Sequence, residues 1–188
     1  MERTSVRNLA GTLFALFIVL GIGLACSGTS DETDKANKLV DDGNSAVTDG
    51  KKFMTDAQEK ITTMMGTEVP QHLSDARTLA NEAIRLYGQA EDKCKAAASK
   101  YDEASKLKID DKFKDYLATK VKEYNKRADL IEALKEVPQA LIDAHDRNAF
   151  TSRANAANQK AESISKEADD LADQAEKIRK DNPNSFKQ

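Results

Sequence analysis

The fold of this chain is decided by residues 76–104, which read ARTLANEAIRLYGQAEDKCKAAASKYDEA. Within this stretch, one set of positions alternates by four and three residues over four heptads without a slip. These positions carry Ala76, Ala80, Ala83, Tyr87, Ala90, Cys94, Ala97, Tyr101 and Ala104. A 3.5-residue repeat sustained over this length is typical of α-helices that supercoil against one another. The stretch therefore predicts one long helix with a continuous apolar seam.

The same spacing occurs twice more in the chain. One set lies upstream and comprises Ala36, Val40, Gly43, Val47, Gly50, Met54, Ala57, Ile61 and Met64. The other lies downstream and comprises Phe150, Ala154, Ala157, Ala161, Ile164, Ala168, Leu171, Ala175 and Ile178. A third, less regular set has Leu117, Val121, Tyr124, Ala128 and Ile131 in register, with Phe113, Tyr116, Leu130 and Leu134 beside it. Pro138 follows this last set and should kink or interrupt its helix.

Helix-breaking residues divide the pattern at 66–70, 107–111, 145–148 and 181–184. Four segments of similar length result, each about 50 Å long as a helix. Short connections between matched helices favour an antiparallel four-helix, coiled-coil-like bundle of long Ala-rich helices, spanning residues 31–181 and followed by a tail at 182–188. Two arrangements remain as alternatives: two separate helical hairpins, or an elongated three-helix form in which the second and third segments run on as one rod.

Several positions have a specific structural interpretation. Gly43 and Gly50 lie on the seam, where we expect close packing against leucine or tyrosine from a neighbouring helix, with a hinge or a docking groove as the alternative. The narrow apolar stripe of the last segment predicts a helix packed at the edge, or else a face offered to a partner helix. Asp110 is placed to cap the third helix, because its carboxylate can accept from free backbone amides.

The first 25 residues differ from the rest of the chain. Arg3 and Arg7 precede an uncharged apolar run from Leu9 to Ala25. This order of a basic region and an apolar region predicts an export signal. The run has about the minimum length that crosses a bilayer core of roughly 30 Å, so an uncleaved single-span anchor is the alternative.

The end of this run, Gly23-Leu24-Ala25-Cys26-Ser27, resembles the lipobox of bacterial lipoproteins. In that family the cysteine carries diacylglycerol, the signal is cut before it, and the new N-terminus is usually acylated. The resemblance implies cleavage between Ala25 and Cys26, lipidation of Cys26, and a lipidated linker at 26–30. Gly23 departs from the family, which normally has leucine or a similar apolar residue there. Ser27 resembles lipoproteins sent to an outer membrane, where one exists.

Composition and motifs argue against other classes of function. Lys and Arg total 29 against 32 Asp and Glu, and no block of like charges occurs, so no nucleic-acid partner is expected. No phosphate-binding, dinucleotide, nucleophile-elbow or EF-hand motif occurs, and no metal-ligand spacing is visible, so we expect no enzyme, no cofactor and no metal. His72 and His145 are interpreted as isolated surface residues.

The remaining reactive side chains have structural interpretations. Cys94 lies on the seam and is expected to be an inert core residue. The four tyrosines are expected to pack in the core, and the adjacent pairs Asp41-Asp42 and Asp169-Asp170 are expected to be solvated.

The sequence thus predicts a lipid-anchored protein of the bacterial cell envelope, attached through Cys26 or through an uncleaved helix. Its helical body would act as a structural, spacer or protein-interaction element with an unidentified protein partner. One alternative is an envelope binding module that holds a partner helix, or an apolar ligand in the bundle interior near Pro138 and the Tyr-bearing seams. The other alternative is self-assembly through the last segment.

Overall fold

The computed structural model describes residues 30–66 and 73–186, which form four long α-helices and one short 3-10 helix. The elements are α2 (Ser30–Gly66), α3 (Leu73–Ser105), α4 (Asp111–Asp143), α5 (Arg147–Asp181) and η1 (Pro183–Phe186). No strand occurs within these described ranges. The predicted all-α fold is confirmed, and each predicted break coincides with the end of a helix. The predicted signal segment and Cys26 lie outside the described residues.

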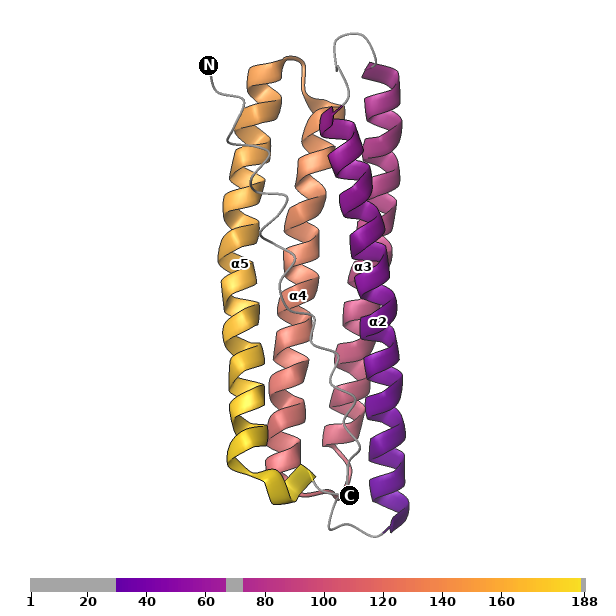
Figure 1. Ribbon diagram of the computed structural model, residues 1–188, viewed down its shortest axis with the longest axis vertical. Coiled ribbons are helices and arrows are strands. Elements are labelled where there is room, and N and C mark those ends of the chain that lie inside the picture. The colour runs from indigo at the N-terminus through magenta and orange to yellow at the C-terminus, as the bar shows by residue number, and fades with distance from the viewer. Residues whose placement is uncertain (1–29, 67–72, 187–188) are drawn as a thin grey trace.

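The four helices run alternately up and down and form an elongated antiparallel bundle (Figure 1). Extensive backbone contacts join α2 to α3, α3 to α4, and α4 to α5, whereas contacts between other pairs of long helices are marginal at most. Because α3 and α4 pack side by side, neither separate hairpins nor a continuous rod is formed. The helices α2 and α5 are therefore the two edge helices, as the narrow stripe on the last segment predicts for α5.

The seam positions face the core as the heptad spacing predicts. All nine seam residues of α3 are buried, including Tyr87 and Tyr101. A Cβ atom built on Gly43 would lie 2.9 Å from Cε1 of Tyr101, and one built on Gly50 would lie 3.2 Å from Cβ of Lys93. Close packing against tyrosine is thus confirmed for Gly43. The neighbour of Gly50 is instead the aliphatic part of the Lys93 side chain. These two glycines let α2 approach α3 closely.

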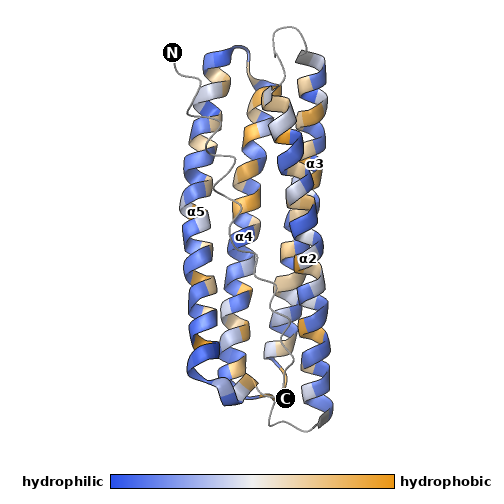
Figure 2. Ribbon diagram, viewed as in Figure 1, coloured by the Kyte–Doolittle hydropathy of each residue, from blue (hydrophilic) through white to orange (hydrophobic). Residues whose placement is uncertain are grey.

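The central helix α4 is buried on two faces. Its register residues, such as Tyr124, meet α3, while its flanking residues, such as Val137, meet α5. The apolar residues that flank the seam of α4 are thus explained, because α5 packs on that second face of the helix. Figure 2 shows the contrast between α4, which has many hydrophobic positions, and the largely hydrophilic α5.

Pro138 does not interrupt α4, which continues to Asp143. Proline in a helix interior removes one backbone hydrogen bond and crowds the preceding turn. Pro138 is fully buried, and packing against its neighbours offsets that loss. Of the two expected effects of Pro138, the interruption is therefore wrong, and the kink stays a prediction.

The predicted tail at 182–188 is also partly structured. Residues Pro183–Phe186 form η1, which turns back beneath the bundle (Figure 1). The Phe186 ring lies edge-on to Phe113 and Tyr116, with ring centroids 5.5 and 5.3 Å away. A single aromatic residue after a run of turn formers has no periodicity, so the sequence analysis did not anticipate this contact.

Asp110 caps α4 as predicted. One carboxylate oxygen accepts from the backbone amides of Lys112 and Phe113, at 2.8 and 3.2 Å. Partial burial alone would raise the pKa of this carboxyl. Hydrogen bonds from the Ser185 side chain and from the Phe113 and Lys112 amides outweigh burial, so the pKa lies below its ordinary value of 3.8. The cap thus favours the charged form.

We expect Asp110→Ala to reduce the free energy of unfolding by about 1 kcal/mol at pH 7. Because the folded pKa is lowered, the stabilisation is complete above pH 3.8 and is lost as the pH falls through the folded pKa. Urea unfolding of both proteins between pH 7 and pH 2 measures this difference. The exposed Asp41→Ala variant is the control, with an expected change within about 0.5 kcal/mol. A difference that persists unchanged at pH 2 would contradict the prediction.

Candidate functional site

The residues assigned to lipidation and cleavage, Cys26 and Ala25, lie outside the described residues. The structure does describe the end of the bundle that follows them, since α2 begins at Ser30. There Oε2 of Glu32 accepts from the backbone amide of Lys108, at 2.9 Å, in the α3–α4 connection. We call this end of the bundle the basal end. It comprises the start of α2, the α3–α4 connection and η1. Three residues separate Cys26 from Ser30, so the Cα atoms of these two residues can be at most about 15 Å apart.

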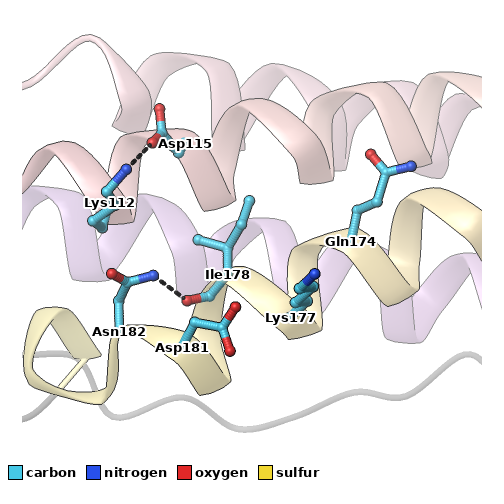
Figure 3. A pocket seen from close by; sticks show the side chains of 7 residues that line it. All are labelled: Lys112, Asp115, Gln174, Lys177, Ile178, Asp181 and Asn182. Carbon is cyan, nitrogen blue, oxygen red and sulfur yellow. Dashed lines mark hydrogen bonds and ion pairs between the residues drawn. The ribbon is translucent and has the colours of Figure 1, made fainter.

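A shallow depression lies at the basal end, between the start of α4 and the end of α5 (Figure 3). Its volume is about 310 Å³, and it is open to solvent. The lining residues are Lys112, Asp115, Gln174, Lys177, Ile178, Asp181 and Asn182. Two lysines offset two aspartates, and Lys112 pairs with Asp115 at 3.1 Å. Ile178 is the one apolar residue of this lining, and the lining has no excess charge to select a ligand.

The depression also lies far from Pro138, one of the positions near which the sequence predicts an apolar ligand as an alternative. Lys112 and Pro138 are near opposite ends of α4, about 40 Å apart along the helix. Pro138 itself is fully buried.

A cluster of charged side chains is buried in the middle of the bundle. We call it the ion cluster; it consists of Lys120, Glu123 and Arg127 from α4 and Asp169 from α5. Arg127 Nε donates to Glu123 Oε1 at 2.8 Å, and Lys120 Nζ donates to Glu123 Oε2 at 2.5 Å. Arg127 Nη2 reaches Asp169 Oδ1 at 3.4 Å. The side chains of Glu123 and Arg127 are 3% and 5% exposed, so both charges are removed from water.

Burial of an ion pair is costly unless each charge finds a partner. Burial alone lowers the pKa of the Arg127 guanidinium, but the Glu123 carboxylate outweighs burial and the pKa is raised above its ordinary value. The Lys120 ammonium also lies 4.8 Å from the centre of the Tyr124 ring, a cation–π contact. Each charge of the ion cluster thus has a partner of opposite charge within the cluster, and the pair of Arg127 with Asp169 crosses the α4–α5 interface.

The ion cluster is not among the features predicted from the sequence. A signal exists, because Glu123 shares a seven-residue spacing with Tyr116, Leu130 and Val137, and Arg127 shares one with Leu134 and Leu141. Two charges on otherwise apolar stripes indicate buried polar positions. Asp169 is predicted to be solvated, and its side chain is indeed half exposed. The same side chain also forms an ion pair with the buried Arg127, which the prediction did not include.

The four tyrosines are buried, as predicted, and fall into three environments. Tyr101 and Tyr124 pack with ring centroids 5.5 Å apart, and the Tyr101 hydroxyl donates to Asn44 Oδ1 at 2.8 Å. Tyr116 stacks with Phe113 near η1, and Tyr87 lies separately in the core. This distribution agrees with packing and does not form a shared stacking surface.

Cys94 is a buried free thiol, as expected for a core residue. Burial raises the pKa of the Cys94 thiol to about 12, because the thiolate would have to form without water. The thiolate is the form that attacks alkylating reagents. Cys94 is therefore almost wholly protonated at neutral pH.

We expect iodoacetamide to modify Cys94 at least about a hundredfold more slowly in native protein than in urea-unfolded protein at pH 8. Peptide mass spectrometry after timed alkylation measures both rates, and an Ala96→Cys variant provides an exposed control on the same helix. Equal rates for Cys94 in the two states would show that the thiol is accessible.

The structure describes one of the two histidines. His145 is exposed in the α4–α5 connection, and His72 lies outside the described residues. Within residues 30–66 and 73–186 no group of three or more His, Cys, Asp or Glu side chains could hold a metal ion. Asp41 and Asp42 are exposed, in agreement with the predicted solvated pair.

None of the helices in the described ranges is both long and apolar enough to span a bilayer. Comparison of the chain with known proteins gave no matching family model, no matching curated protein and no matching solved structure.

Proposed function

We propose that this protein is a lipid-anchored component of a bacterial cell envelope and that its helical bundle acts as a spacer or protein-interaction element. The observation that carries the proposal is the sequence Leu24-Ala25-Cys26 at the end of the uncharged run that follows Arg3 and Arg7. Signal cleavage before Cys26 would leave that residue to carry the lipid. Several acyl chains anchor stably, whereas one chain gives marginal binding.

The shape of the bundle supports a tethering role. Helices of 33 to 37 residues make a rod about 50 Å long. Since α2 begins four residues after Cys26, the basal end would lie close to the membrane and the opposite end would stand away from it. The C-terminal end of α2 and the α4–α5 connection would then be presented about 50 Å from the leaflet.

The polar surface fits a body that lies in an aqueous compartment. Met65, beside the α2–α3 connection, is the one large hydrophobic residue that is exposed among the described residues. The partner would accordingly recognise polar surface, because the described part offers no extended apolar patch.

The test is the intact mass of the protein expressed in a bacterial host, with wild type beside Cys26→Ala, in membrane and soluble fractions. We expect wild type to lose residues 1–25 and gain the mass of acyl chains, and Cys26→Ala to lose both changes. Cys94→Ala is the matched control and should be processed as wild type. A full-length, unmodified mass in the membrane would replace the lipid with a single-span anchor, and a trimmed, lipid-free soluble form would indicate secretion.

A further inference from the structure

The last long helix is attached to the bundle differently from the others. Its close backbone contacts are with α4 and η1. Its buried side chains are all alanine, namely Ala154, Ala157, Ala161, Ala168 and Ala175. Its larger apolar side chains, Phe150, Ile164 and Ile178, are only partly buried against the core. An alanine side chain buries much less apolar area than valine, leucine or methionine. The interface that holds α5 is therefore continuous but thin.

The other edge helix is attached more firmly. From α2, Val40, Val47 and Met64 are fully buried, and Gly43 lets the backbone lie against the Tyr101 ring. The Tyr101 hydroxyl adds a hydrogen bond to Asn44. Edge position alone therefore does not make a helix weakly held.

Much of the remaining attachment of α5 is ionic and exposed. Lys126 pairs with Glu167 at 3.0 Å, and Arg153 pairs with Asp143 at 3.1 Å and with Glu136 at 3.7 Å. Pairs of this kind contribute little to stability and are screened by salt. The α4–α5 contact should therefore weaken as ionic strength rises.

The ion cluster lies where α4 meets α5, with three of its residues on α4 and one on α5. Arg127 reaches Asp169 on α5, and Glu123 lies on the same seven-residue stripe as Val137, which packs on Ala154 and Ala157. Separation of α5 would return water to the Glu123 and Arg127 charges. The recovered hydration offsets part of the loss of apolar contact, so separation here is less costly than at a wholly apolar interface.

The C-terminal end of α5 is fastened by η1. Phe186 packs edge-on against Phe113 and Tyr116, and the Ser185 amide donates to the Asn182 carbonyl at 3.0 Å. At the other end, Ala144, His145 and Asp146 connect α4 to α5. The helix thus has a short hinge at one end and an aromatic latch at the other.

We propose that α5 and η1 form a strap that detaches from α4 as a unit while α2, α3 and α4 stay packed. Detachment rotates the strap about residues 144–146 and uncovers the surface of α4 around Arg127 and Val137, which contact Asp169 and Ala154 of α5. The strap is a conformational device of the fold, and it does not depend on the lipid anchor.

Hydrogen exchange followed by mass spectrometry tests the strap on the protein as purified from a bacterial host. At 0.05 M NaCl we expect amides of 150–180 to exchange at least about tenfold faster than buried amides of α3, as one cooperative block. Raising the salt to 1 M should accelerate exchange in α5 about threefold and leave α3 unchanged.

Phe186→Ala should accelerate exchange in α5 about tenfold more, without acceleration in α2 or α3. Phe53→Ala, which removes a half-buried ring from the other edge helix, is the matched control and should accelerate exchange in α2 but not in α5. The strap is overturned if α5 exchanges at the same rate as α3 and α4 at both salt concentrations. It is also overturned if Phe186→Ala accelerates all four helices equally.

Discussion

Replacement of Glu123 by leucine is expected to reduce the free energy of unfolding by about 3–5 kcal/mol. The substitution removes the acceptor for Arg127 at 2.8 Å and for Lys120 at 2.5 Å. Arg127 cannot lose its proton and cannot easily reach water, since its side chain is 5% exposed. The Arg127 charge then stays in the interior without its closest partner and keeps the longer 3.4 Å contact to the half-exposed Asp169, which explains the large effect.

The double variant Glu123→Leu/Arg127→Met distinguishes two contributions to the free energy of unfolding. One is the penalty for burying Arg127 without Glu123, and the other is the net stabilisation that the ion pair itself provides. Removal of both charges with similar volume is expected to bring stability to within about 1 kcal/mol of wild type, or above it. Urea unfolding followed by circular dichroism gives all three free energies. The exposed Lys60–Glu82 pair, at 2.7 Å, provides the control, because a pair in water contributes little and Glu82→Leu should leave the unfolding midpoint almost unchanged. A Glu123→Leu effect as small as that of Glu82→Leu would contradict the burial of the cluster.

Replacement of Tyr101 by alanine is expected to cost about 3–5 kcal/mol. Tyr101 is 2% exposed, contacts the Tyr124 ring and fills the space beside Gly43. Its loss would leave a cavity between α2, α3 and α4 and an unpartnered Asn44 oxygen. Tyr101→Phe keeps the ring and removes the hydroxyl, so we expect a loss of about 1 kcal/mol. A similar loss for both variants would show that the hydrogen bond, rather than the ring, carries the effect.

The same contact can be tested from the α2 side. Gly43→Ala places a methyl group 2.9 Å from the Tyr101 ring, and overpacking of this kind costs about 1–3 kcal/mol, less the gain in helix propensity. Gly88 lies in the interior of α3 with no atom within 4 Å of a built Cβ. Gly88→Ala is the matched control and should stabilise by about 0.5–1 kcal/mol. Thermal unfolding distinguishes the two by the sign of the shift in Tm.

Much of the architecture could be predicted from local pattern. The heptad spacing identified the seams of α2, α3 and α5, because a helix has a fixed number of residues per turn and its buried face repeats accordingly. Asp110 was identifiable as a cap, since its position before an apolar periodic run matches the free amides of a helix start. These features depend on residues close together in the sequence.

Other features depend on residues far apart in the sequence and could not be read from it. The extra apolar residues of the third segment signalled a second neighbour but did not identify it as α5. Pro138 carries a strong local signal for interruption, and burial among neighbouring helices overrides that signal. The contact of Phe186 with Phe113 requires the last residues to return to the start of α4, which no periodicity encodes.

By itself, the sequence determined the four helical segments, their buried faces and the resemblance of residues 24–26 to a lipobox. Each of these follows from a short repeat or a local motif. The tertiary structure decided which helices are neighbours, that α2 and α5 lie at the edges, and that Glu123 and Arg127 are enclosed together with Asp169. Packing and desolvation are properties of surfaces brought together from distant parts of the chain, and those surfaces exist only once the helices have assembled.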